Sequence, residues 1–183
     1  LIEWAAEEGR RQYGLTIPSP GELRYLTFQE PIGVVAALTP WNFPAVAPAR
    51  KAGSALAAGC SCILKPSELT PGTATAMARA FVDAGLPAGV LNVLYGDPRT
   101  VSTALIESPI VRKVTFTGSV PVGRQLAELA GRHMKPCLME LGGHSPVIVL
   151  ADADLDRVAA ASVTAKFRNA GQVCTSPTRF FVQ

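Results

Sequence analysis

Apolar runs and amphipathic stretches alternate along most of this 183-residue chain. Short, continuously apolar runs predict buried strands, because both faces of such a strand are covered, whereas the longer Ala-rich stretches predict helices. Strands are predicted at residues 32–38, 60–64, 90–94, 113–117 and 136–141, and helices at 45–58, 71–84, 100–107 and 120–131. This alternation predicts an α/β fold with a parallel sheet that carries helices on both faces.

The pattern changes after Gly142-Gly143. A strand is predicted at residues 146–150, a helix at 155–169 and a further strand at 179–183, for which the sequence suggests no partner. We therefore expect two domains, residues 1–141 and residues 142–183, of which the second holds the first elements of another α/β domain. The chain begins with a predicted helix at 2–13 and a Pro-rich passage, and it reads as part of a longer protein.

Composition and charge narrow the classes of function. Hydrophobic residues make up 48% of the chain and charged residues 17%, which indicates a globular protein. The net charge is only +3 and the basic residues are scattered, so neither a nucleic acid nor a membrane is expected as a partner. Cys60 and Cys62 are too close on one predicted strand for a disulfide or for usual zinc spacing. Buried free thiols, no metal site and a cytoplasmic location are therefore expected.

Several polar residues follow the predicted strands, and parallel sheets bind ligands at the carboxyl ends of their strands. Gly118 and Ser119 open a helix, where a phosphate could be received, although any strand-to-helix turn could need this glycine. Lys65 and Glu68 follow another strand. The carboxylate could bind ribose hydroxyls and repel a 2′-phosphate, or the two side chains could form an exposed ion pair.

Three further residues suggest an amide donor, a base and a nucleophile. Asn42 lies in a turn stiffened by two prolines and could donate to a developing oxyanion, or only cap the following helix. Glu140 ends an apolar strand before Gly142-Gly143 and could be a general base with room for water, or a surface residue. Cys174 could be an accessible nucleophile or a buried structural thiol.

Two arginines complete the set of candidates. Arg50 lies two turns into the helix after Asn42, and Arg168 lies six residues before Cys174. Two guanidinium groups near a nucleophile could bind a substrate carboxylate in a bidentate manner. The alternative is one surface arginine and one interdomain arginine.

Five runs, taken in order, resemble those of the aldehyde dehydrogenase superfamily: PWNFP (40–44), KPSE (65–68), FTGSVPVG (116–123), MELGG (139–143) and GQVC (171–174). The resemblance implies a Rossmann-like cofactor domain that binds NAD, with NADP also possible and Glu68 favouring NAD. It implies that Cys174 attacks the aldehyde, that Asn42 holds the oxyanion and that Glu140 activates water to hydrolyse a thioester. The implied cofactor contacts are Pro40, Trp41, Lys65, Ser67, Glu68, Gly118, Ser119 and Leu141.

Within this superfamily, the runs EEGRRQYG (7–14) and KFRNAGQVC (166–174) are most similar to succinate-semialdehyde dehydrogenases. That likeness implies that Arg50 and Arg168 bind the carboxylate of an aldehyde such as succinate semialdehyde. His144 departs from the family pattern after the MELGG run. Ser176 stands where a second cysteine often lies, so a redox switch of that type is not expected.

The superfamily's members are much longer chains and are expected to form homo-oligomers. A downstream Glu-x-Phe-Gly-Pro run and the hairpin that builds dimers are expected to be absent here. Three functions remain open: oxidation of an aldehyde to an acid, a catalytically incomplete fragment that binds a nucleotide weakly, and acyl transfer to coenzyme A. Glu140 argues against the third, because acylating relatives lack the hydrolytic base.

Overall fold

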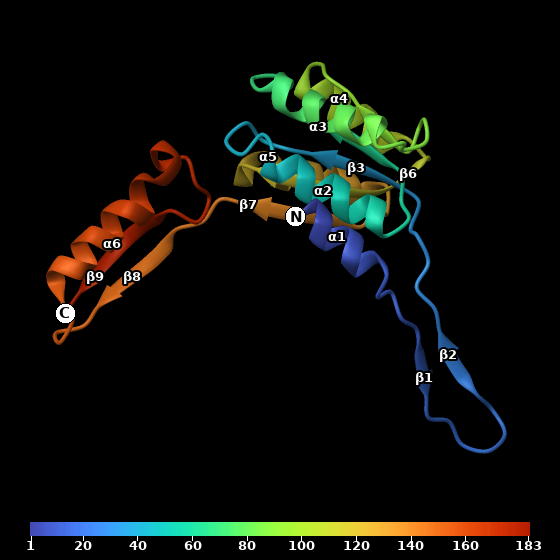
Figure 1. Ribbon diagram of the computed structural model, residues 1–183, viewed down its shortest axis with the longest axis horizontal. Coiled ribbons are helices and arrows are strands. Elements are labelled where there is room, and N and C mark those ends of the chain that lie inside the picture. Colours follow the sequence, from blue (N-terminus) through green and yellow to red (C-terminus); the bar gives the residue numbers. More distant parts are fainter.

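The computed structural model describes residues 1–183 as a helix-covered sheet, a projecting hairpin and a second, smaller unit (Figure 1). Five parallel strands form the sheet in the order β5-β4-β3-β6-β7. They are β3 (Val34–Leu38), β4 (Cys62–Lys65), β5 (Leu91–Val93), β6 (Val111–Gly118) and β7 (Cys137–Leu141). The predicted parallel α/β sheet is confirmed.

Helices cover both faces of this sheet because its central strands are apolar on both sides. Val35 and Ala37 of β3 belong to the core cluster that includes α2, whereas Ala36 and Leu38 belong to the cluster that includes α4 and α5. The four helices are α2 (Val46–Ala57), α3 (Pro71–Asp83), α4 (Pro98–Glu107) and α5 (Val120–Arg132). Each lies within a few residues of its predicted range.

The strand order places a switch point between β3 and β6. From β3 the chain continues outward through β4 to β5, and then returns through α4 to β6 on the other side of β3. The loops that follow β3 and β6 therefore lead away from each other at the carboxyl edge of the sheet, which leaves a crevice for a ligand. Residues 39–42 and 118–119 begin these two loops.

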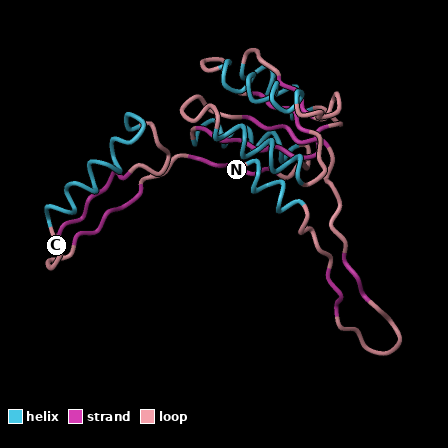
Figure 2. The backbone as a smooth tube through the Cα atoms, viewed as in Figure 1, coloured by secondary structure: helices cyan, strands magenta, loops and turns pink.

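The segment before the sheet differs from its prediction. The first helix, α1 (Ile2–Gly9), is shorter than the predicted 2–13. A two-stranded antiparallel hairpin follows, made of β1 (Leu15–Ile17) and β2 (Tyr25–Thr27), and it projects away from the sheet (Figures 1 and 2). Only a Pro-rich passage was predicted for this segment, and its two strands were not. Each strand has only three residues, all of them exposed, so the sequence pattern is too short to predict a strand.

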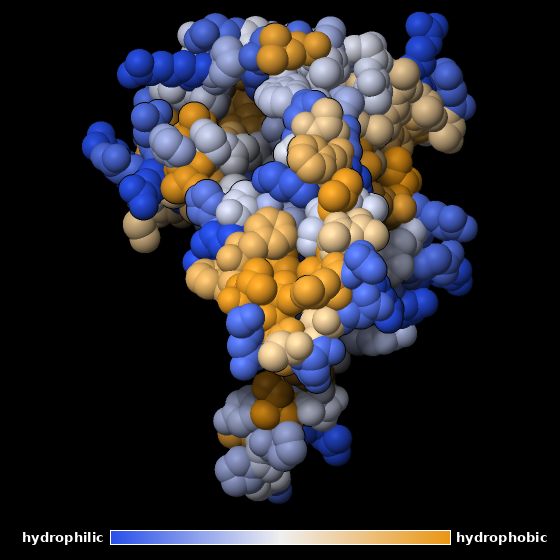
Figure 3. Space-filling view, turned by 90° about the vertical axis from the view of Figure 1, so that its left-hand side faces the viewer, coloured by the Kyte–Doolittle hydropathy of each residue, from blue (hydrophilic) through white to orange (hydrophobic).

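Beyond β7 lies the second unit, formed by β8 (Ser145–Val149), α6 (Leu155–Phe167) and β9 (Pro177–Val182). β8 and β9 pair in parallel, so the expectation that the last strand has no partner is wrong. A helical crossover is the usual way to join two parallel strands, and α6 provides it. Figure 3 views this side of the molecule and shows a broad apolar surface. No helix of the protein has the length and apolar character needed to cross a membrane.

Candidate functional site

A cleft of about 920 Å³ lies where the loops after β3 and β6 lead apart, and it reaches the loop after α6. Its lining contains most of the predicted site residues: Pro40, Trp41, Asn42, Arg50, Gly118, Ser119, Glu140, Leu141, Arg168 and Cys174. Lys65, Ser67 and Glu68 are not part of this lining and lie at the end of the neighbouring strand β4. Side chains from both units of the molecule thus meet in one cleft.

Cys174 is exposed on the loop that precedes β9, and it lines the cleft. The alternative of a buried structural thiol is therefore wrong for this residue. Cys60 and Cys62 are buried free thiols, as predicted. Burial raises the pKa of Cys62 to about 12, so its sulfur stays protonated and unreactive at neutral pH. No three His, Cys, Asp or Glu side chains come together in a way that could hold a metal ion.

Asn42 connects the end of β3 to the loop that carries Cys174. Its Nδ2 donates a hydrogen bond to the backbone O of Gln172 at 2.8 Å. In the opposite direction, Nδ2 of Asn169 donates to the backbone O of Asn42 at 3.0 Å. The alternative role as a helix cap is wrong, because the residue at the N-cap of α2 is Ala45. The sequence alone did not single out Asn169.

The loop before Cys174 has an unusual backbone. The helix predicted at 155–169 ends at Phe167 and is followed by the short turn η1 (Arg168–Gly171). Asn169, Ala170 and Gly171 have φ values of 51°, 55° and 76°, which place them in the left-handed region. Glycine and asparagine tolerate this region, whereas alanine does not favour it. The turn directs the chain from α6 back toward the cleft.

Glu140 and Lys51 form the charged floor of the cleft. Glu140 is exposed at the end of β7 and lines the cleft. Lys51 is buried on α2, and its Nζ donates to Oγ1 of Thr115 at 2.6 Å. Burial lowers the pKa of Lys51 to about 8, although the negative charge of Glu140 acts in the opposite direction.

The sequence alone did not single out Lys51, but a signal for it exists. The buried positions of α2 are Pro48, Lys51, Ala52, Gly53 and Ala55. Their spacing of three and four residues marks the buried face of an amphipathic helix. A lysine on such a face needs a compensating environment, which makes it a candidate functional residue.

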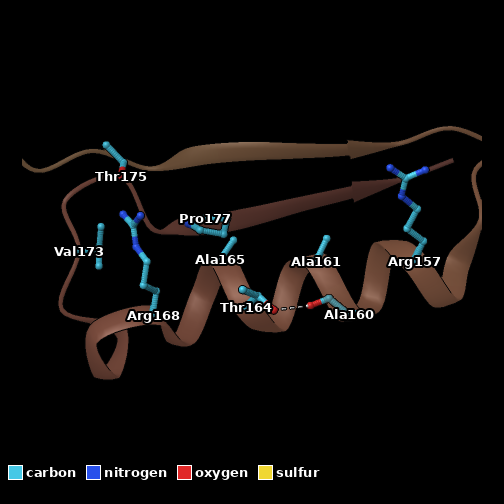
Figure 4. Close-up of a pocket in the computed structure, with 9 residues that line it drawn as sticks. All are labelled: Arg157, Ala160, Ala161, Thr164, Ala165, Arg168, Val173, Thr175 and Pro177. Carbon is cyan, nitrogen blue, oxygen red and sulfur yellow. Dashed lines mark hydrogen bonds between the residues drawn. The ribbon is translucent and has the colours of Figure 1, made fainter.

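Arg50 and Arg168 line the cleft together with Cys174, and neither takes part in an ion pair. Arg168 also lines a second pocket of about 620 Å³ that follows α6. Figure 4 shows its guanidinium pointing toward Val173 and Thr175, with Arg157 at the other end of the pocket. Two unpaired guanidinium groups can bind an anionic group of a small molecule at this end of the cleft.

The helix N-terminus of α5 offers free donors for a phosphate. Ser119 is the N-cap of α5, and its side chain makes no capping hydrogen bond. Oγ1 of Thr39, the residue that directly follows β3, is buried and has no hydrogen-bond partner. A buried polar atom without a partner is uncommon and points to a ligand or water that completes it. These groups fit the pyrophosphate of a dinucleotide.

Lys65 and Glu68 form an ion pair at the end of β4, which lies on the other side of β3 from β6. Lys65 is buried, and its Nζ donates to Oε2 of the exposed Glu68 at 2.6 Å. The hydrogen bond from Lys65 holds the pKa of the Glu68 carboxyl below its usual range. The carboxylate is therefore ionised at neutral pH, and it can accept hydrogen bonds from ribose hydroxyls.

Comparison with known proteins agrees with this geometry. The profile of the "Aldehyde dehydrogenase family" matches residues 1–183. The chain is 58% identical to 4-(hydroxymethyl)benzenesulfonate dehydrogenase TsaD1 of Comamonas testosteroni, and 51% identical to succinate-semialdehyde dehydrogenase [NADP(+)] GabD of Escherichia coli. Both matches cover 100% of this chain and 38% of the relative. A crystal structure of succinate-semialdehyde dehydrogenase from Burkholderia pseudomallei superposes with a TM-score of 0.96 over 99% of this chain and 38% of its own, at 51% identity.

Proposed function

The chain belongs to the aldehyde dehydrogenase family, and we propose that its site oxidises an aldehyde to a carboxylic acid through a thioester on Cys174. The observation that carries this proposal is the single cleft in which the exposed Cys174, Asn42 and Glu140 meet. The chain spans 38% of the length of the relatives described above, so the proposal concerns the polypeptide that carries this sequence.

The first step is addition of the Cys174 thiolate to the aldehyde. A bond forms between Sγ and the carbonyl carbon, and the carbonyl π electrons move to the oxygen, which becomes an oxyanion. One N–H of the Asn42 amide is already bonded to Gln172. The other N–H can donate to the oxyanion, which stabilises the charge where it develops.

The second step needs an acceptor for the hydrogen on the former carbonyl carbon. A bound nicotinamide dinucleotide supplies this chemistry by accepting a hydride, and the carbon is left as a thioester with Cys174. We propose that Pro40, Trp41 and Leu141 contact this cofactor and that Gly118 and Ser119 bind its pyrophosphate. Lys65, Ser67 and Glu68 would bind the adenosine ribose. The ionised carboxylate of Glu68 favours NAD, because a 2′-phosphate beside it would be repelled.

Hydrolysis of the thioester completes the reaction. Glu140 accepts a proton from a water molecule, whose oxygen attacks the thioester carbon. The bond from carbon to Sγ then breaks, the electron pair returns to sulfur as the thiolate, and the acid is released. Because Glu140 is exposed in the cleft, water can reach it. The presence of this base supports hydrolysis over acyl transfer to coenzyme A.

We propose a small aldehyde that carries an anionic group as the substrate, with succinate semialdehyde as the first candidate. The unpaired guanidinium groups of Arg50 and Arg168 line the same cleft as Cys174, and they suit a carboxylate or a sulfonate. Two names among the relatives agree with this class, since one contains a semialdehyde and the other a benzenesulfonate.

The remaining proposals concern organisation. We propose a cofactor domain at residues 1–141 and the start of a catalytic domain at 142–183, because the five-stranded sheet ends with Leu141 and β8 belongs to another sheet. The four free thiols suit a reducing compartment such as the cytoplasm. A homo-oligomer is proposed for the polypeptide that carries this sequence.

A pair of cysteine variants tests the mechanism. In the polypeptide that carries this sequence, Cys174→Ala should abolish NADH formation from succinate semialdehyde and NAD. The matched control Cys137→Ala removes the other exposed thiol and should keep the wild-type rate. Turnover that survives in Cys174→Ala would rule out the covalent mechanism. Nucleotide binding by the wild type without any turnover would support the alternative of a catalytically incomplete chain.

A further inference from the structure

We propose that Asn169 is a positioning residue that aims the free N–H of the Asn42 amide at the oxygen of the bound aldehyde. The inference rests on the proposed function of the cleft and adds a residue to it. The juxtaposition that carries it is a reciprocal pair of hydrogen bonds between segments 127 and 130 residues apart in the sequence.

The geometry of an amide group gives the first step. The side chain of asparagine carries two N–H donors in one plane. One of them, in Asn42, is bonded to the backbone O of Gln172 at 2.8 Å. Because the group is planar, holding one N–H also sets the direction of the other. Asn42 is half-buried and lines the cleft, so this second donor is available to a ligand there.

The bond from Asn169 gives the second step. Its Nδ2 donates to the backbone O of Asn42 at 3.0 Å, so it holds the main chain from which the Asn42 side chain projects. Each asparagine therefore bonds, through its side chain, to the backbone of the segment that carries the other. Two bonds in opposite directions resist both sliding of the segments and rotation of the Asn42 amide.

The backbone before Cys174 gives the third step. Ending α6 would require a single left-handed residue, whereas Asn169, Ala170 and Gly171 all have positive φ. An unfavourable conformation at Ala170 persists only if surrounding contacts determine it, and such conformations concentrate at functional sites. Here the turn brings both the Asn169 amide and the Gln172 carbonyl against Asn42. The left-handed backbone of the turn, to which the methyl group of Ala170 contributes nothing, therefore places both hydrogen bonds.

Three variants separate the side chain of Asn169 from its backbone. Asn169→Gly keeps the left-handed conformation and removes the amide, and Asn169→Asp keeps the shape but has no N–H to donate. Ala170→Gly is the matched control, because it relaxes the same turn and leaves both hydrogen bonds. Asn42→Ala serves as the reference for complete loss of the amide donor.

Aldehyde turnover and alkylation both use the sulfur of Cys174, and the variants should change these two rates differently. Loss of an oxyanion donor costs roughly 10²–10³-fold in kcat, so we expect Asn169→Gly and Asn169→Asp to lose about tenfold or more, with a much smaller change in KM. Alkylation of Cys174 by iodoacetamide forms no oxyanion, and its rate should stay within about twofold of wild type. Ala170→Gly should resemble wild type in both rates. Asn42→Ala/Asn169→Gly should be no slower than Asn42→Ala, because Asn169 acts through Asn42.

Equal losses of turnover and of alkylation in Asn169→Gly would show that Asn169 only holds the loop, and would overturn the inference. Additive losses in the double variant would overturn it as well. Exchange of the Asn42 Nδ2 protons with water, followed by NMR, gives a readout that needs no substrate. It should be several-fold faster in Asn169→Gly than in wild type. If the wild type oxidises no aldehyde, the proposed function fails, and the exchange rates still decide the role of Asn169.

Discussion

A buried charge lies directly beneath the cleft. Lys51 is only 8% exposed, and the hydroxyl of Thr115 is the single hydrogen-bond acceptor of its Nζ. Burial disfavours the ammonium form, and the negative charge of Glu140 compensates this in part. The folded protein therefore tolerates the charge of Lys51 at neutral pH at a cost in stability. A charge retained at a cost suggests a role in the site, where it can balance the carboxylate of Glu140.

The low pKa of Lys51 predicts an unusual dependence of stability on pH. Its pKa falls from an ordinary 10.5 to about 8 on folding, so between these pH values the unfolded chain binds more protons than the folded one. The contribution of this group to the free energy of unfolding should therefore rise with pH over this range, by roughly 3 kcal/mol. Denaturant unfolding of wild type and Lys51→Met measures it. The stability difference between the two should shift toward wild type as pH rises from 8 to 10.5.

Comparing the two proteins at each pH removes the contributions that they share. Cys62 is shared only in part: its raised pKa makes stability fall as pH rises above its ordinary value of 9.0, and the charge of Lys51 opposes that rise in pKa. A difference between wild type and Lys51→Met that stays flat across the range would mean that the ammonium group is not desolvated in the folded protein.

Site residues that lie in a short, recognisable sequence motif could be predicted from the sequence. Site residues that are marked only by long-range contacts could not. Asn42, Glu140 and Cys174 each lie in a short motif at a strand or helix end, and the structure gathers them in one cleft. Lys51 lies in an ordinary Ala-rich helix, and only its neighbour Thr115, 64 residues away, makes it notable. Asn169 owes its interest to a contact across 127 residues, which local pattern does not encode.

Among elements, α5 and β7 make a close contact at the edge of the cleft. Gly123 lies in the first half of α5, and a Cβ added there would lie 2.5 Å from Cδ2 of Leu141, the last residue of β7. Leu141 also lines the cleft and is a proposed cofactor contact. The absence of a side chain at Gly123 thus lets α5 pack close to the proposed cofactor site.

Two glycine variants on α5 test this packing. Gly123→Ala should force Leu141 to move, weaken NAD binding several-fold and destabilise the protein by about 1 kcal/mol, as overpacking does. Gly131→Ala is the matched control, since nothing lies within 4 Å of a Cβ there. It should leave NAD binding unchanged and stabilise the helix by up to about 1 kcal/mol. Calorimetric titration with NAD and thermal unfolding measure both effects. Identical behaviour of the two variants would contradict the close contact at Leu141.

The elements of the central sheet were predictable because their signal is local and strong. β3 is a continuous apolar run between Gly33 and Pro40, and β6 alternates apolar with polar residues and ends at Gly118. Both lie inside the sheet, where their apolar residues are covered. The strands β1 and β2 have three residues each and no buried face, so their sequence pattern is too short to predict a hairpin. The pairing of β8 with β9 joins strands 28 or more residues apart, and the sequence of the last strand does not show which strand it joins.

Across the whole molecule, burial is distributed unevenly. The two core clusters both lie in the five-stranded sheet and its helices. In residues 142–183 the buried positions are Val149, Ser176 and Pro177, and α6 has none. The residues between β7 and β8 are hydrogen-bonded to the second unit. The guanidinium of Arg179 donates two hydrogen bonds to the backbone O of His144, at 3.1 and 2.9 Å. Hydrogen bonds of this kind do not replace a hydrophobic core.

This distribution predicts two levels of protection from hydrogen exchange in the 183-residue chain. Amides of β3 and β6 should exchange slowest, because the core clusters must open to release them. Amides of α6, β8 and β9 should exchange at least roughly tenfold faster, since little apolar surface has to be exposed when the second unit opens. Exchange measured by mass spectrometry on peptides from each unit decides this. Equal protection of β9 and β3 would show that both units unfold together, which would require a stronger connection between them than the hydrogen bonds from Asn42 and Asn169.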